Sequence, residues 1–289
     1  MASRGIAGYQ VIFTPRHAVI IAVLVAMSGL IVACATGMRR DAGAPASVSD
    51  VNQAALNATA TFPPGPAGKL IAYGRDILDQ TPKYAGAYIT ARMSCAACHP
   101  GGGTQAHAGS LLGSYATFPQ WNKRAHRFIA LQDRLAECFL YSMNGRPPPY
   151  SSREMVALTA YIAWLSRGAP TGIGFPSQRP IGVTPAQTPN ATHGSQVYSA
   201  RCASCHGANG DGAGSIPPLW GPHSFNDKAG MSKLDRIMPF VKVAMPRNAP
   251  GSLTDQESAD VAAFVLAHPR PHFDKNKLVE FPAEKAGYF

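Results

Sequence analysis

Two short motifs in this sequence combine two cysteines and a histidine at a spacing that suits covalent attachment of a metal-bearing cofactor. They read Cys95-Ala96-Ala97-Cys98-His99 and Cys202-Ala203-Ser204-Cys205-His206. With 6 cysteines and 9 histidines in 289 residues, independent placement gives about 0.004 such motifs per chain, so two of them are a strong signal. Thiols separated by two residues lie on one helical turn, where each can add to a vinyl group of haem while the adjacent histidine binds the iron. The sequence therefore predicts two covalently attached haem c groups.

The surrounding sequence disfavours two competing interpretations of these motifs. A thioredoxin-like redox pair would lie next to a βαβ pattern, which is not visible here. A zinc site would bring its two ligand pairs closer together in the chain. The predicted cofactor-binding residues are Cys95, Cys98, His99, Cys202, Cys205 and His206.

The segments around the two motifs repeat one plan. Short amphipathic helices are expected upstream, over 74–78 and over 194–198, and the second resembles the first helix of a class I cytochrome c. Downstream, capping boxes begin at Ser151 and Thr254 and open helices over 155–165 and 258–267, which prolines at 170 and 269 help to stop. The predicted fold class is all-α, with two tandem class I cytochrome c-like haem domains after an N-terminal export or anchor segment.

The N-terminal segment indicates the compartment. Arg4 and Arg16 precede the uncharged stretch 18–36, which would be about 28 Å long as a helix and so close to one bilayer crossing. Cys34 lies in a sequence that resembles a lipoprotein cleavage box and also fits a signal-peptidase site. A lipid on Cys34, an uncleaved helix and a cleaved signal all remain open. Each places the rest of the chain on the periplasmic side, and we expect it to be anchored to the membrane.

Composition indicates globular domains with defined boundaries and excludes nucleic acid as an expected partner. Hydrophobic residues make up 46% of the chain against 15% charged, which suits globular domains. The net charge is +10, but the basic residues form no run and no basic helix interleaved with aromatics, so nucleic acid is not an expected partner. The predicted divisions are 1–36, signal or membrane anchor; 37–65, flexible tether; 66–172, cytochrome c domain with the catalytic haem; 173–190, proline-rich linker; 191–271, cytochrome c domain with the electron-transfer haem; and 272–289, tail.

The sixth ligand of each iron differs between the two domains. Met245, followed by Pro246, lies 39 residues after His206 and is the predicted sixth ligand of the second iron, with Met231, Met238 and Lys242 as alternatives. The same spacing from His99 falls on Cys138. We predict that Cys138 is the sixth ligand of the first iron, with Met143 or a plain structural thiol as alternatives. A thiolate ligand lowers the potential of the iron, which suits a site that does chemistry.

The residues near Cys138 include several cations. If 122–143 is mainly helical, Arg127, Arg134, Cys138 and Ser142 lie on one stripe at spacings of seven, four and four, with Arg124 one turn earlier. The alternative interpretation is a solvated basic helix face. Two arginines beside a haem would bind a small dianion, because guanidinium pairs well with oxyanions.

This cluster resembles a known family, the dihaem thiosulfate dehydrogenases. The resemblance covers roughly 66–271 and rests on Trp121-Asn122-Lys123-Arg124, on Leu131 to Phe139, on Ser142-Met143-Asn144-Gly145, on Tyr73-Gly74 and on Phe240-Val241-Lys242 before Met245-Pro246. It implies that His99 and Cys138 bind the first iron and that His206 and Met245 bind the second. It also implies that Arg124, Arg134 and Ser142 contact the substrate at the first haem, while the second passes electrons onward. The hydrophobic N-terminal segment with Cys34 departs from this pattern.

The predicted function is oxidation of two thiosulfate ions to tetrathionate, in a direction that the sequence does not fix. Cys138 would also be able to leave the iron and carry a sulfur covalently, because a thiolate is both a ligand and a nucleophile. The expected partners are thiosulfate, the membrane through the N-terminal segment, and a small c-type cytochrome or membrane oxidase as electron acceptor. Two alternatives remain: a membrane-tethered dihaem electron carrier without substrate chemistry, and another sulfur-oxidation cytochrome that acts on a carrier protein.

Overall fold

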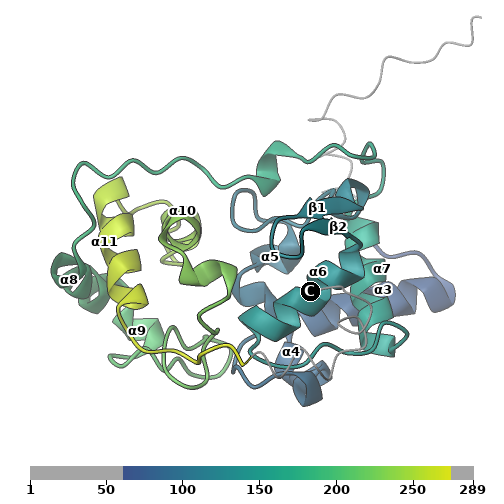
Figure 1. The fold of residues 1–289 in the computed structure, drawn as a ribbon, viewed down its shortest axis with the longest axis horizontal. Coiled ribbons are helices and arrows are strands. Elements are labelled where there is room, and N and C mark those ends of the chain that lie inside the picture. The colour runs from purple at the N-terminus through teal and green to yellow at the C-terminus, as the bar shows by residue number, and fades with distance from the viewer. Residues whose placement is uncertain (1–60, 275–289) are drawn as a thin grey trace, which may run out of the picture. The chain divides into compact units, whose positions relative to one another are not determined.

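The structure, a computed structural model, describes residues 61–274, which belong to one compact unit (Figure 1). Residues 1–60 and 275–289 lie outside the described part of the chain. The predictions for the segment over 18–36 with Cys34, for most of the tether and for most of the tail therefore fall outside the described residues. No helix within 61–274 has both the length and the apolar character needed to cross a membrane.

The described residues are mostly helical, with one small hairpin. The elements of the first domain are α3 (Gly65–Asp79), α4 (Thr81–Tyr84), η1 (Gly86–Tyr88), η2 (Cys95–Ala97), α5 (Pro100–Gly103), η3 (Tyr115–Thr117), β1 (Gln120–Asn122), β2 (Arg127–Ile129), α6 (Leu131–Glu137), the π-helix η4 (Cys138–Ser142) and α7 (Arg153–Leu165). After η5 (Pro176–Gln178), the second domain contains α8 (Ala191–Arg201), α9 (Ala203–His206), η6 (Gly230–Ser232), α10 (Leu234–Ala244) and α11 (Asp255–Leu266). The helices expected around 74–78, 155–165, 194–198 and 258–267 are confirmed.

Each domain is built on a close crossing of its first and last helices. In Figure 1, α3 lies beside α7 and α8 lies beside α11. A glycine stands at each crossing: a Cβ on Gly74 would come within 2.1 Å of the Ala157 carbonyl oxygen, and one on Gly194 within 2.0 Å of that of Asp260. Only a hydrogen fits there, so these glycines allow backbone-to-backbone packing. The repeated plan of the sequence is therefore a repeated helix crossing.

The two last helices begin differently. At α11, Thr254 and Glu257 form the predicted capping box: the Thr254 hydroxyl accepts a hydrogen bond from the Glu257 amide at 3.1 Å, and the Glu257 carboxylate accepts one from the Thr254 amide at 2.7 Å. At α7, the predicted box starting at Ser151 is wrong. Ser152 is the N-cap and accepts from the Met155 amide, while Glu154 accepts a hydrogen bond from the Tyr73 hydroxyl at 3.3 Å.

The prediction of a mainly helical segment over 122–143 is also wrong, because its first third is a β-hairpin. β1 pairs antiparallel with β2. The Asn122 side-chain oxygen accepts hydrogen bonds from the amides of Arg124 and Ala125, which closes a turn, and His126 has a left-handed backbone with φ 52°. Local side-chain bonding of this kind competes with a helix, so the helix begins only at Leu131.

Three buried clusters hold the described residues together. One lies within the first domain, around α3 and α7, and another within the second, around α8 and α11. The third joins the two domains. Its buried members are Ala91, Met93, Leu140, Tyr141, Met143, Phe225, Ala229 and Phe273.

The segment between the domains contacts the first of them. Phe175 is fully buried in the core of the first domain, and the side-chain Nε2 of Gln178 donates to the Leu112 carbonyl at 2.7 Å. Gly113 makes room for Phe175, whose ring would lie 2.8 Å from a Cβ at that position. The start of the proline-rich segment is thus fixed by burial of an aromatic side chain.

We expect the substitution Gly194→Ala to destabilise the protein by about 1–3 kcal/mol, because its methyl group meets a helix backbone that cannot move away. Chemical denaturation of the haem-loaded protein, followed by circular dichroism, measures this change. Gly182→Ala is the matched control, since a Cβ there meets open space. Equal stability of the two variants would contradict the proposed role of Gly194 at the crossing.

Candidate functional site

The first Cys-x-x-Cys-His motif forms a single tight turn. η2 begins at Cys95, and the Cys95 carbonyl accepts hydrogen bonds from the amides of Cys98, at 3.1 Å, and His99, at 3.0 Å. Both thiols are partly buried, and burial raises the pKa of Cys95 to about 11 and that of Cys98 to about 12. The two thiols are therefore protonated at neutral pH and lie on the same turn as the histidine.

A backbone carbonyl orients the imidazole of His99. Its Nδ1 donates to the carbonyl of Gly109, which leaves Nε2 as the free ligand nitrogen. Burial lowers the pKa of His99, and Arg134 lowers it further, so the ring is neutral, as iron binding requires. Gly109 has φ 63°, and a Cβ there would lie 2.4 Å from the Cys98 carbonyl oxygen. Sequence reasoning missed Gly109, since a glycine in a loop carries no ligand signal.

The second motif has the same construction. His206 ends α9, its amide bonds the Cys202 carbonyl at 3.0 Å, and its Nδ1 donates to the Pro217 carbonyl at 3.0 Å. Burial lowers the pKa of His206 and raises that of Cys202 to about 11. Both motifs thus fit a covalently attached haem: two thiols on one turn, and a neutral imidazole with Nε2 free.

Met245, the predicted sixth ligand of the second iron, directly follows α10. It is the C-cap of that helix, has extended backbone angles and precedes a cis peptide bond to Pro246. The amine of the alternative Lys242 is engaged by the Leu253 carbonyl and by Asp255, at 3.1 Å from its Oδ1. The side chains of Met231 and Met238 pack against the core of the second domain. Met245 stays the predicted ligand.

Cys138 lies at the junction of α6 and the π-helix η4, close to the first motif. Burial raises the pKa of its thiol, and the charges of Arg134 and Arg124 oppose that rise. After burial, the charge of a Cys138 thiolate is among the causes that raise the pKa values of Cys95 and Cys98. Such charge effects act over short distances, so the Cys138 thiol lies near the two thiols of the first motif. The predicted grouping of Cys138 with the first motif thus has a structural basis, although the two lie about forty residues apart in sequence.

Met143, the alternative ligand, is a core residue in this structure. Its side chain is 2% exposed and lies in the cluster that joins the domains. Cys95 and Cys98 pack against the same cluster. Met143 therefore lies in the same region as the first motif. The paramagnetic resonance of Cys138 and Met143 variants distinguishes which of the two residues is the sixth ligand of the first iron.

A buried carboxylate that the sequence did not reveal holds Arg134. The Arg134 Nη1 lies 2.7 Å from Oε2 of Glu137, whose side chain is 2% exposed. Oε1 of Glu137 accepts a hydrogen bond from the side-chain Nδ2 of Asn122 at 3.0 Å. The Arg134 side chain itself is 56% exposed, and the pair fixes one side of a guanidinium whose other donors bond no side chain or carbonyl within 61–274. The i, i+3 spacing of Arg134 and Glu137 in the sequence is the feature that would have predicted this ion pair.

Arg124 reaches the same region from the hairpin. Its guanidinium lies 3.9 Å from the ring centroid of Tyr141, and its Nη2 donates to the carbonyl of Lys228 at 2.9 Å. Its charge and that of Arg134 both act on the Cys138 thiol. Ser142, half-buried, ends the π-helix that Cys138 begins. The structure thus brings Arg124, Arg134 and Cys138 together.

Arg127 does not share the predicted stripe. It lies on β2, and its Nη2 is 3.7 Å from Oδ1 of the buried Asp133. The reason is the turn at Asn122 to His126, which replaces the expected first turns of helix. Arg127 therefore supports the start of α6 from outside the cationic cluster.

Two arginines connect the haem-binding motifs of the two domains. Arg247, two residues after Met245, donates from Nη2 to the carbonyl of Ala96 at 3.2 Å. Its charge acts on both the Cys98 thiol and the His206 imidazole. Arg92 donates to the Asp211 carbonyl at 2.9 Å. The loop that carries the predicted second sixth ligand therefore touches the first attachment motif.

Comparison with protein families identifies both halves of the chain. Residues 83–171 match the family model described as SoxA/TsdA, cytochrome c domain, and residues 191–269 match the model described as cytochrome c. The predicted fold class, two tandem cytochrome c domains, is confirmed, with the small β1–β2 hairpin as an addition. The chain accordingly carries two covalently bound c-type haems, as predicted.

The chain is also similar to characterised proteins. It is 40% identical over 228 residues, 75% of this chain and 84% of the relative, to a thiosulfate dehydrogenase of Allochromatium vinosum. It is 37% identical over 255 residues, 82% of this chain and 80% of the relative, to one of Thiomonas intermedia. A solved structure of the thiosulfate dehydrogenase TsdBA from Marichromatium purpuratum superposes with a TM-score of 0.69 at 32% identity, covering 77% of this chain and 52% of that one. This chain thus spans about half the length of that solved protein.

We expect Cys138→Met to abolish a thiolate-type low-spin signal in the electron paramagnetic resonance spectrum of the oxidised, haem-loaded protein, because the iron then has a thioether ligand instead. The signal of the second haem serves as the internal reference and stays unchanged. Met143→Leu, which conserves volume in the core, is the matched control and keeps the thiolate signal. Loss of that signal in Met143→Leu alone would refute Cys138 as the ligand.

Proposed function

Because the chain belongs to the family of dihaem thiosulfate dehydrogenases, we propose that it oxidises two thiosulfate ions to one tetrathionate and passes the two electrons to an external acceptor. The single observation that carries this proposal is a pair of arginines held near Cys138: Glu137 binds Arg134, and Tyr141 and the Lys228 carbonyl hold Arg124. When bound, the two haems supply two irons that each accept one electron, which matches a two-electron oxidation. The remaining work falls to side chains of the first domain.

The main electrostatic obstacle is repulsion between two dianions that must come into sulfur contact. Arg134 offers its free donors while Glu137 holds its other side, and Arg124 is fixed by Tyr141 and by the Lys228 carbonyl. Positive charges held in place offset this repulsion without reorganising during the reaction. They also orient the two ions for S–S bond formation. We propose that Ser142, four residues after Cys138, donates a further hydrogen bond to substrate oxygen.

Cys138 has two proposed roles, ligand and nucleophile. In the covalent form of the reaction, its thiolate sulfur forms a bond to the terminal sulfur of one thiosulfate, and two electrons leave for the acceptor. The second thiosulfate then attacks that terminal sulfur, forms the S–S bond of tetrathionate and releases the Cys138 thiolate. Charges and atoms balance in both steps, and the thiolate is regenerated. The same steps in reverse reduce tetrathionate.

The second domain is proposed to pass electrons onward, with His206 and Met245 as iron ligands. The contact of Arg247 with Ala96 supports close approach of the two motifs. A small c-type cytochrome or a membrane oxidase is the proposed acceptor. As a c-type cytochrome the protein belongs on the periplasmic side, and we propose membrane attachment through the segment over 18–36 or through a lipid on Cys34.

The direct test supplies thiosulfate to the oxidised, haem-loaded protein and follows reduction of the haem absorption bands, together with the amount of tetrathionate formed. We expect two thiosulfate ions consumed for each tetrathionate and for two electrons delivered. No haem reduction by thiosulfate would leave a plain electron carrier. Turnover that requires an added sulfur-carrier protein, with no free tetrathionate, would instead support the carrier-dependent sulfur-oxidation cytochrome.

We expect Arg124→Ala and Arg134→Ala each to lower kcat/KM for thiosulfate by about 10- to 100-fold, the loss of one charge-assisted hydrogen bond of about 1.5–3 kcal/mol. Steady-state assays with a small inorganic electron acceptor measure this change without involving a protein partner. Arg75→Ala removes an exposed arginine of the same domain that pairs with Asp79 at 3.5 Å, and it should leave kcat/KM unaltered. If the three variants behaved alike, Arg124 and Arg134 would be ordinary surface charges.

A further inference from the structure

A loop of the second domain enters the first domain beside the predicted catalytic residues. Phe225, Asn226 and Ala229 are 5%, 0% and 0% exposed, although they lie in a segment between short elements. Phe225 and Ala229 belong to the cluster that joins the domains, together with Leu140 and Tyr141 of η4. A fully buried asparagine in such a loop must satisfy its polar atoms, and it does so on the first domain.

Asn226 bonds backbone carbonyls of the π-helix that carries Cys138. Its Nδ2 donates to the Leu140 carbonyl at 2.9 Å, and its backbone amide donates to the Tyr141 carbonyl at 3.2 Å. The last carbonyls of a helix have no partner within the helix, and a π-helix of five residues has almost no others. Nδ2 also donates to the Asn144 side-chain oxygen at 3.2 Å, just beyond the helix end. The second domain therefore caps η4.

The same side chain fixes the partner of Arg124. Oδ1 of Asn226 accepts a hydrogen bond from the Lys228 amide at 3.0 Å, which closes a turn, and the Lys228 carbonyl then accepts from Arg124. The side-chain amide of Asn226 thus makes two sets of hydrogen bonds. Nδ2 bonds the helix of Cys138, and Oδ1 bonds the turn that receives Arg124.

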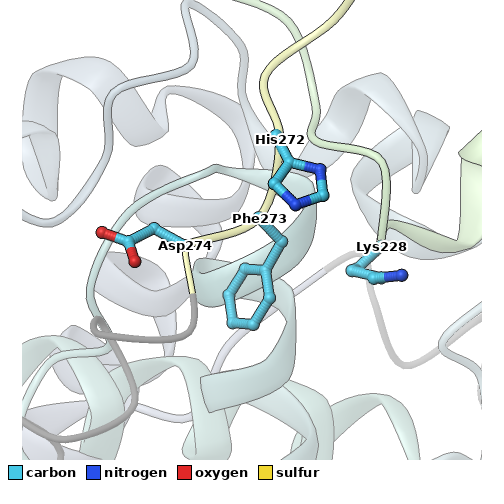
Figure 2. Close-up of a pocket in the computed structure, with 4 residues that line it drawn as sticks. All are labelled: Lys228, His272, Phe273 and Asp274. Carbon is cyan, nitrogen blue, oxygen red and sulfur yellow. The ribbon is translucent and has the colours of Figure 1, made fainter.

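Aromatic packing closes the arrangement. The Phe273 ring lies 4.8 Å from the Tyr141 ring, on which Arg124 also rests, and the Phe273 amide donates to Asp227 at 2.9 Å. Figure 2 shows Lys228 and the segment His272 to Asp274 lining one pocket. Lys228 thus receives Arg124, and Asp227 holds Phe273, whose ring packs on Tyr141.

We propose that Asn226 is a positioning residue for the first haem site, so that the second domain completes the active site of the first. This inference rests on the proposed function for its kinetic consequence, but its structural consequence stands without it. Loss of the hydrogen bonds from Nδ2 frees the Leu140 carbonyl and lets the π-helix relax, which shifts Cys138 and Ser142. Loss of the hydrogen bond to Oδ1 opens the turn at Lys228 and releases Arg124.

Two substitutions distinguish the hydrogen bonds of Nδ2 from the hydrogen bond to Oδ1, both tested in the full-length, haem-loaded protein. Asn226→Asp keeps an acceptor for the Lys228 amide and removes the donor to Leu140, whereas Asn226→Ala removes both. Asn190→Ala is the matched control: Asn190 caps α8 by accepting from the Thr192 amide at 2.8 Å, in the same domain and away from η4. The thermal midpoint of each variant is compared first, so that general destabilisation is accounted for.

Three readouts follow. Hydrogen–deuterium exchange of a peptide over 138–145 should rise at least tenfold in both Asn226 variants and stay at the wild-type rate in Asn190→Ala. The thiolate-type paramagnetic signal of the first haem should broaden or split in both Asn226 variants, with the second haem signal unchanged. Thiosulfate kcat should fall at least tenfold in both, and KM should rise further in Asn226→Ala, where Arg124 is also released.

Exchange and spectra indistinguishable from those of Asn190→Ala would overturn the proposal. If the wild-type protein were inactive with thiosulfate, the proposed function would be wrong but the role of Asn226 would still be tested. Hydrogen–deuterium exchange over 138–145 and the paramagnetic signal of the first haem report on the capping of η4 without thiosulfate. If one of the two Asn226 variants fails to fold, the other still decides the outcome by exchange at matched thermal stability.

Discussion

In each domain, a hydrogen bond from the histidine Nδ1 to a backbone carbonyl decides which ring nitrogen faces the iron. His99 uses the Gly109 carbonyl and His206 uses that of Pro217. The loops that supply these carbonyls are fixed in turn by the domain cores, since Leu112 and Trp220 next to them are buried. A carbonyl can only accept, so the tautomer is set by the backbone and stays set when other parts of the site move. Both haem sites depend on this constraint.

The first site differs from the second in how charge and burial are balanced. Burial raises the pKa of the Cys138 thiol, the charges of Arg134 and Arg124 lower it, and the Glu137 carboxylate also raises it. Arg134 is available for this role because Glu137 is buried and holds only one side of its guanidinium. Cations close to the sulfur favour the thiolate form of Cys138 and suit the proposed binding of dianions. The second domain places a methionine after α10 and requires no comparable cluster.

The interface between the domains combines apolar packing with hydrogen bonds. Its apolar part buries Met143, Leu140 and Phe225, and its polar part is the set of hydrogen bonds from Asn226 to the π-helix. A buried amide is costly unless all its donors and acceptors are satisfied, so this contact specifies one relative placement of the loop and the helix. Arg247 of the second domain and Arg92 of the first add hydrogen bonds across the interface, to the carbonyls of Ala96 and Asp211. The two haem domains are thereby joined through hydrogen bonds to backbone carbonyls.

The sequence by itself determined the features that depend on spacing along one element. The two Cys-x-x-Cys-His turns, the helices at the start and end of each domain, and the capping box at Thr254 are of this kind, because local geometry dictates them. The stripe from Arg127 failed because a side-chain turn at Asn122 outcompeted the helix. Gly109 and Asn226 gave no signal in the sequence, and the spacing of Arg134 and Glu137 did not reveal that Glu137 is buried. Their roles arise from partners distant in the chain or from burial, and only the tertiary structure brings those partners together.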